Sequence, residues 1–178
     1  MKKKIVVNSE EFERMLKRLS LEIVEKNINV LDKIAFIGIR KRGVPIAERL
    51  VSYIAEFEGF TPEIGELDIS LYRDDQTMIS NEPVISGGKW NFSFKDRILI
   101  IVDDVLNSGR TVRAAIENIL DHGKPSCIQL CVVVDTRSRI YPVSSDFTGS
   151  IIRISKDEFV GLSIKDIDNE DNVYVKKN

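Results

Sequence analysis

The sequence predicts an α/β fold, with helices on both faces of a central, mostly parallel sheet. Short apolar runs, typical of strands buried on both faces, alternate along the middle of the chain with segments of helical spacing. Glycine and proline separate the two kinds of segment. The chain has 178 residues, of which 43% are hydrophobic, enough for one domain with its own core. We therefore predict a single domain over residues 1–178.

The first helix is predicted from local signals. Asn8 and Glu11 have the spacing of a capping pair, in which each side chain bonds the other residue's backbone N–H. Apolar residues then recur at helical spacing from Phe12 to Ile23. The polar face of this helix should expose four basic residues, namely Arg14, Lys17, Arg18 and Lys26.

Strands and helices alternate after this point. Apolar runs predict strands at residues 33–39, 63–72, 97–102 and 126–134. Helices are predicted at residues 44–57, with Pro45 in the first turn, and 112–122, which Gly123 ends. Residues 73–97 form a long polar excursion, and such segments are usually functional. Shorter strand-like pieces lie at 150–154 and 172–176, whereas the acid-rich stretch 165–171 carries no recognisable motif.

Two unusual loops, residues 40–43 and 103–111, directly follow predicted strands. The carboxyl ends of parallel strands meet at one edge of a sheet, and ligands bind beyond that edge. We therefore expect both loops to contribute to one site.

Composition excludes several classes of protein. Lys and Arg total 26 against 28 Asp and Glu, a net charge of −2, which argues against a protein that coats nucleic acid by bulk charge. No apolar run approaches the roughly 20 residues that span a bilayer. The apolar stretch after the first lysines is too short for a signal peptide. The expected location is the cytoplasm.

Cys127 and Cys131 both lie in a predicted strand. At 3.3 Å per residue they are about 13 Å apart, too far to bridge each other. A metal site would need more Cys or His nearby, and His122 is the one histidine of the chain. We expect two buried, reduced thiols.

The segment from Asp103 to Thr111 predicts a sugar-phosphate site. Backbone N–H groups at a helix N-terminus favour a phosphate, and the Ser108 and Thr111 hydroxyls add donors. Gly109 allows the backbone to approach the anion closely. Asp103 and Asp104 would repel phosphate but suit sugar hydroxyls or a Mg²⁺-bound sugar. A plainer interpretation is that the two acids only cap a helix.

These residues resemble the phosphoribosyl-diphosphate motif of type I phosphoribosyltransferases: a strand, two acids, two apolar residues and a Ser-Gly-Arg-Thr loop. Residues 38–43, 65–75 and 126–135 narrow the resemblance to the pyrimidine-operon regulator/uracil phosphoribosyltransferase subfamily. It covers roughly residues 8–155. The resemblance implies the type I fold, with its sheet flanked by helices and a small hood region.

The resemblance also implies a reaction, in which uracil displaces diphosphate from the ribose to give uridine monophosphate, with Mg²⁺ assisting the leaving group. Asp103 and Asp104 would orient the ribose and are the candidate protein ligands of a magnesium ion held mainly through the substrate. The 5′-phosphate loop would comprise Asn107, Ser108, Gly109, Arg110 and Thr111. The diphosphate loop would comprise Arg40, Lys41, Arg42 and Gly43, with Arg73 closing over it. The base region would comprise Asp135, Thr136 and Arg137.

Two departures from related sequences bear on the base. Asn107 stands where hypoxanthine/guanine-type members carry an Asp thought to act as a base, and an amide cannot take up a proton near neutral pH. Asp135 stands where those members carry a Lys. Both argue against purine chemistry. Residues 136–142 also differ from the subfamily's usual sequence in the part of the fold that should frame the base.

Two alternatives accompany the uracil enzyme. One is a nucleotide-sensing RNA-binding regulator of pyrimidine genes with little catalysis, and the other is a phosphoribosyltransferase for another base. Cations typical of the RNA-binding members are replaced here by Leu21, Ser138, Ser144 and Ser150, which disfavours RNA binding. The resemblance further implies a dimer or tetramer.

Overall fold

The computed structural model describes residues 3–69 and 87–177. A short 3₁₀ segment, Ile28–Lys33, leads into the second strand. The strands are β1 Lys4–Val7, β2 Ile34–Ile39, β3 Glu63–Leu67, β4 Gly88–Lys89, β5 Ile98–Leu106, β6 Cys127–Asp135, β7 Phe147–Ile151, β8 Glu158–Ser163 and β9 Asn172–Lys177. The helices are α1 Ser9–Lys26, α2 Gly43–Glu58, α3 Arg110–His122 and α4 Lys165–Asp168.

The central sheet has the strand order β4-β3-β2-β5-β6-β7. Strands β2, β3, β5, β6 and β7 are parallel, and the short β4 runs antiparallel to β3 at the edge. In the register, Ile37 of β2 lies between Gly65 of β3 and Ile101 of β5. The expected α/β architecture is therefore confirmed.

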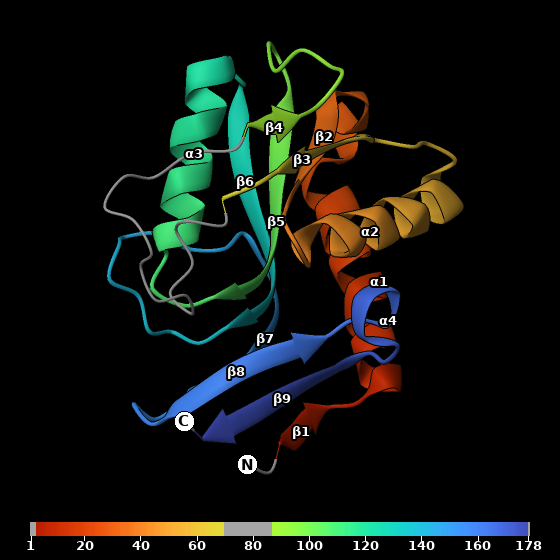
Figure 1. Cartoon of the computed structure of the whole chain (residues 1–178). Coiled ribbons are helices and arrows are strands. Elements are labelled where there is room, and N and C mark those ends of the chain that lie inside the picture. The colour runs from red at the N-terminus through yellow and green to blue at the C-terminus, as the bar shows by residue number, and fades with distance from the viewer. Residues whose placement is uncertain (1–2, 70–86, 178) are drawn as a thin grey trace.

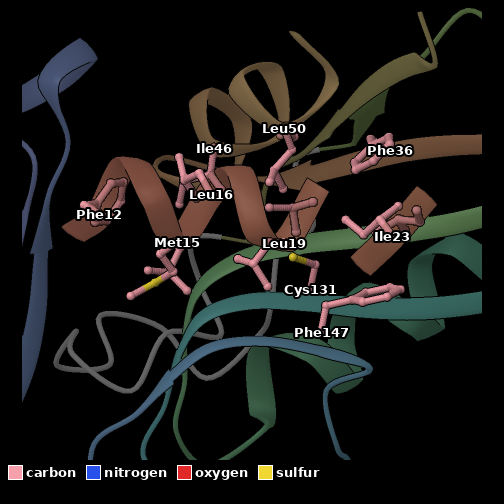
Figure 2. Packing of buried hydrophobic residues seen from close by; sticks show 14 of the residues in the cluster. Phe12, Met15, Leu16, Leu19, Ile23, Phe36, Ile46, Leu50, Cys131 and Phe147 are labelled. Atoms are coloured by element: carbon pink, nitrogen blue, oxygen red, sulfur yellow. The ribbon is translucent and has the colours of Figure 1, made fainter. Parts of the chain in front are cut away.

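Helices cover both faces of this sheet (Figure 1). Alternate residues of each strand point to opposite faces, so Phe36 packs on the side of α1 and α2, whereas Ile37 packs on the side of α3. Figure 2 shows the first side, where Leu16 and Leu19 of α1 approach Ile46 and Leu50 of α2. Helix α1 begins at the predicted cap: the Asn8 side chain accepts from the Glu11 N–H, and the Glu11 carboxylate accepts from the Asn8 N–H.

A second sheet, β1-β9-β8, is antiparallel and lies across the end of the central sheet where the parallel strands finish (Figure 1). Its Val160, Leu162 and Val173 are buried in the same cluster as the apolar face of α1. This sheet is the hood. Both ends of the chain build it, since β1 pairs with β9.

Four expectations about local structure were wrong. Strand β5 continues to Leu106, so Asp103 and Asp104 lie within the strand and not in the following loop. Helix α3 begins two residues earlier than expected, at Arg110. Cys127 is exposed, because it is the first residue of β6, while Cys131 is buried. The predicted strand 63–72 ends as a strand at Leu67, and residues 70–72 lie outside the described part of the chain.

Among residues 3–69 and 87–177 the structure contains no helix that combines the length and the apolar character needed to cross a membrane.

Candidate active site

A cavity of about 260 Å³ lies between the carboxyl ends of the parallel strands and the hood. Its walls include six of the residues predicted for the site: Arg42, Asp103, Asp104, Asn107, Thr111 and Thr136. The rest of the wall is Val105, Ile154 and residues of the hood strands, including Phe159, Val160, Leu162 and Tyr174. Side chains that are more than 60 positions apart in the sequence thus meet at the expected edge of the sheet.

The two adjacent carboxylates lie within β5, directly after the last residue that pairs with β2. Asp103 and Asp104 are only 4% and 5% exposed, and both line the cavity. The Asp103 side chain accepts the Asp104 N–H at 2.9 Å, and the Asp104 side chain accepts the Val105 N–H at the same distance. These bonds fix both carboxylates where strand pairing is ending, beside the cavity.

The loop between β5 and α3 presents a helix N-terminus to the same side. Gly109, the residue before α3, has a left-handed φ of 87°, which favours glycine. The N-cap residue Gly109 has no side chain to cap this helix, and the first turn contains no acid, so the backbone N–H groups there suit an anion. The Ser108 carbonyl accepts the N–H groups of Ile140 and Tyr141 at 2.9 and 3.2 Å. The loop is therefore braced by the segment that follows β6.

The loop between β2 and α2 brings three basic side chains near this edge. Arg40 pairs with Glu66 at 3.3 Å and reaches Asp68 at 4.0 Å. Lys41 is exposed, and the peptide bond before it is cis. Arg42 is the one of the three that lines the cavity. Its guanidinium contacts Asp168 of α4.

Gly43 packs against the strand that carries the two acids. A Cβ atom added at Gly43 would lie 2.3 Å from the Val102 carbonyl oxygen and 3.5 Å from the Asp103 Cα. The close approach therefore joins α2 to β5 directly behind the carboxylates. Arg73, the residue predicted to close over the diphosphate, lies outside the described residues.

The predicted base region follows β6. Asp135 is fully buried; it accepts the Arg137 N–H at 2.8 Å and pairs with the side chains of Arg137 and Arg139. Thr136 lines the cavity and bonds Asn107. Arg137 lines a second, more open hollow of about 490 Å³ together with Thr136, Ser138 and Arg153.

Sequence reasoning missed the hood side of the cavity. Strand β8 was not predicted, and only the tertiary fold brings Phe159, Leu162 and Tyr174 to the wall of the cavity. Asp168 was missed because a single acid in an acid-rich stretch carries no signal of its distant partner, Arg42.

The residues present are compatible with a magnesium ion shared with a substrate. Carboxylate oxygens are the ligands that Mg²⁺ prefers, and the ion usually keeps several other oxygen ligands. Within the described ranges there is no group of three or more His, Cys, Asp or Glu side chains placed to hold a metal. Asp103 and Asp104 would therefore supply only part of its coordination.

Comparison with known proteins agrees with this geometry. A family model described as "Phosphoribosyl transferase domain" matches residues 3–166. Two relatives carry the name Bifunctional protein PyrR. The one from Clostridium acetobutylicum is 41% identical over 170 residues, covering 96% of this chain and 95% of the relative. The one from Clostridium perfringens is 46% identical over 165 residues, covering 93% and 92%.

Solved structures of low sequence identity share the fold. The hypoxanthine phosphoribosyltransferase of Trypanosoma cruzi has a TM-score of 0.75 at 17% identity and covers 98% of this chain and 96% of its own. That of Staphylococcus aureus has a TM-score of 0.73 at 19% identity, with coverage of 98% and 90%. The chain belongs to the type I phosphoribosyltransferase family, within the group of its bifunctional PyrR relatives.

Proposed function

We propose that this phosphoribosyltransferase uses uracil as its base and forms uridine monophosphate and diphosphate from phosphoribosyl diphosphate. The observation that carries the proposal is the cavity lined by both Asp103 and Asp104 next to the N-terminus of α3, where the N-cap residue is a glycine. This arrangement suits a ligand with sugar hydroxyls in the middle and a phosphate at one end.

The 5′-phosphate would bind at the start of α3. The N–H groups of Gly109 and Thr111 and the hydroxyls of Ser108 and Thr111 would donate hydrogen bonds to it, and the helix dipole favours its charge. Asn107 and Arg110 complete this loop. The Ser108 hydroxyl already accepts the Arg110 N–H at 3.3 Å, which stiffens the turn before the ligand arrives.

The ribose would lie over Asp103 and Asp104, with its diphosphate toward Arg40, Lys41 and Arg42. As the base nitrogen bonds to C1 of the ribose and gives up its N–H proton to water, the bond from C1 to the diphosphate oxygen breaks and the diphosphate leaves with the electron pair. The sugar becomes cation-like and the leaving group gains charge, so buried carboxylates on one side and cations on the other stabilise this step. A magnesium ion, which Asp103 and Asp104 would help to hold, would supply further neutralisation of the diphosphate.

Two features support uracil as the base. The resemblance of residues 38–43, 65–75 and 126–135 is to a uracil-type subfamily, and Asn107 offers an amide where purine-type members carry an Asp. The hood wall of the cavity includes Glu158 and Tyr174, and its apolar part, with Val160 and Leu162, suits the faces of a flat ring.

A panel of bases tests the proposal. The purified protein is incubated with phosphoribosyl diphosphate, Mg²⁺ and uracil, cytosine, hypoxanthine, guanine or adenine, and nucleotide products are separated by chromatography. We expect uridine monophosphate as the main product. A different nucleotide would refute uracil but keep the reaction, whereas no product with any base would refute the reaction itself.

The Asp104→Asn variant tests the ribose site. Loss of one charge-assisted hydrogen bond costs about 1.5–3 kcal/mol, so kcat/KM should fall about 10- to 100-fold. Asp166→Asn, on the exposed side of α4, is the control and should match the wild type. An unchanged rate in Asp104→Asn would refute the role of that carboxylate.

RNA regulation is a second candidate, favoured by the word "bifunctional" in the name of the relatives. The exposed basic side chains of α1 each form an ion pair with an acid: Arg14 with Glu10, Lys17 with Glu13, Arg18 with Glu22 and Lys26 with Asp146. This pairing lowers the positive potential of the face. A gel-shift series with pyrimidine-operon leader RNA, with and without uridine monophosphate, discriminates: tight binding at physiological salt would favour the regulator.

A further inference from the structure

One ion pair connects the acid-rich tail, residues 164–171, with Arg42 in the wall of the cavity. The Arg42 Nη2 lies 3.3 and 3.2 Å from the two carboxylate oxygens of Asp168. Both side chains are partly buried, at 28% and 29% exposure, so water screens their attraction less than on an open surface. The contact joins α4 to the start of α2.

The Asp168 carboxylate is itself held in place. Its Oδ2 accepts the Ile164 N–H at 2.9 Å, and the Ile164 carbonyl accepts the Asp168 N–H. Ile164 is fully buried in the core. The acid therefore has a fixed position from which to orient a flexible partner.

A second ion pair, between Asp171 and Arg49, connects residues 164–171 with α2. Asp171 is buried, pairs with Arg49 at 2.9 Å and accepts the Lys165 N–H at 2.8 Å. Arg49 follows Arg42 by seven residues, or about two helical turns, so both arginines lie on one side of α2. Residues 164–171 are thus attached to α2 at two points, one of which is beside the cavity.

We propose that Asp168 is a positioning residue that holds the Arg42 guanidinium toward the diphosphate of the substrate. The contacts with Asp168 use only Nη2. The other terminal nitrogen, Nη1, is therefore left to donate to an anion in the cavity that Arg42 lines. The proposal rests on the proposed role of the 40–43 loop in binding diphosphate. Asp168 lies beyond the residues matched by the family model.

Binding of phosphoribosyl diphosphate to Asp168→Asn tests the proposal. The amide keeps the shape of the side chain but removes its charge. Affinity, measured by calorimetry with Mg²⁺ and no base, should fall about 3- to 10-fold, the effect of no longer pre-ordering one long side chain. Asp166→Asn is the matched control. In steady-state assays KM for phosphoribosyl diphosphate should rise while kcat and the KM for the base stay near wild type.

The Arg42→Gln variant and the double variant separate this positioning role from a general loss of stability. Arg42→Gln alone should weaken binding, and Asp168→Asn should then add nothing. Additive losses would mean that Asp168 acts without Arg42 and would overturn the proposal. Tighter binding in Asp168→Asn would mean that the acid competes with diphosphate, which also overturns it.

Failure of the underlying function gives a different result. If Arg42→Gln binds normally, the diphosphate role of Arg42 fails and the proposal fails with it. If Arg42→Gln binds weakly but Asp168→Asn equals the wild type, the loop keeps its role and only the positioning by Asp168 is refuted. Because calorimetry needs no base, a wrong assignment of uracil does not affect either outcome.

Discussion

The Thr136 hydroxyl lies 2.9 Å from the amide oxygen of Asn107, and both residues line the cavity. The Leu106 carbonyl accepts the Thr136 backbone N–H at 3.0 Å and lies 3.3 Å from the same hydroxyl, so the shorter contact, to Asn107, is the better one for the hydroxyl hydrogen. With its oxygen engaged, the Asn107 amide offers N–H donors to a ligand. A carbonyl of the base next to the reacting nitrogen would be a matching acceptor.

Thr136→Val should remove the hydrogen bond that orients the Asn107 amide. Valine keeps the shape of threonine but removes the hydroxyl, so the Asn107 amide loses a bond worth about 1–2 kcal/mol and is free to rotate. We expect kcat/KM for uracil to fall about 5- to 30-fold, as measured by nucleotide formation. Thr136→Ser keeps the hydroxyl and should remain close to the wild type. Equal rates in the valine and serine variants would show that the hydrogen bond has no role in catalysis.

Gly43→Ala should disturb the site by disrupting the packing of α2 against β5. The new Cβ would lie 2.3 Å from the Val102 carbonyl oxygen, and a backbone atom can move away only by shifting the neighbouring Asp103. We expect a loss of about 1–3 kcal/mol in the free energy of unfolding, measured in urea, together with weaker binding of phosphoribosyl diphosphate.

Gly59→Ala is the control for this variant. Gly59 ends α2 with a φ of 64° and has open space around its Cβ position. Its replacement should cost about 1 kcal/mol of left-handed strain and leave substrate binding unchanged. Wild-type binding in Gly43→Ala would contradict the link between this packing and the carboxylates.

The elements predicted well from the sequence are those fixed by near neighbours. The Asn8–Glu11 capping box needs residues three apart, and the strands predicted at 33–39 and 97–102 are apolar runs that correspond to β2 and to the first part of β5. The exposed basic residues of α1 follow from its apolar spacing. Such signals are complete within a short window, so a single sequence contains them.

The elements that were missed depend on distant partners. Strand β1 is four residues long and mostly exposed. It pairs with β9, where Lys4 lies opposite Val175. Nothing local marks Lys4–Val7 as a strand, because its pairing edge is supplied by the other end of the chain. Asp168 is a similar case, since its role depends on Arg42, 126 positions away. Side-chain pairing at this separation is set by the tertiary fold.

The two cysteines should react very differently, although four positions separate them. Cys127 is exposed at the start of β6, and Cys131 is buried beneath α1. Burial also raises the pKa of the Cys131 thiol, and because the thiolate is the reactive form, it should stay inert even at about pH 9. Iodoacetamide should therefore modify one thiol per native chain and two in urea, as counted by mass spectrometry. Cys127→Ser should reduce the native count to zero, whereas Cys131→Ser should leave it at one; modification of both thiols in the folded wild type would contradict the burial of Cys131.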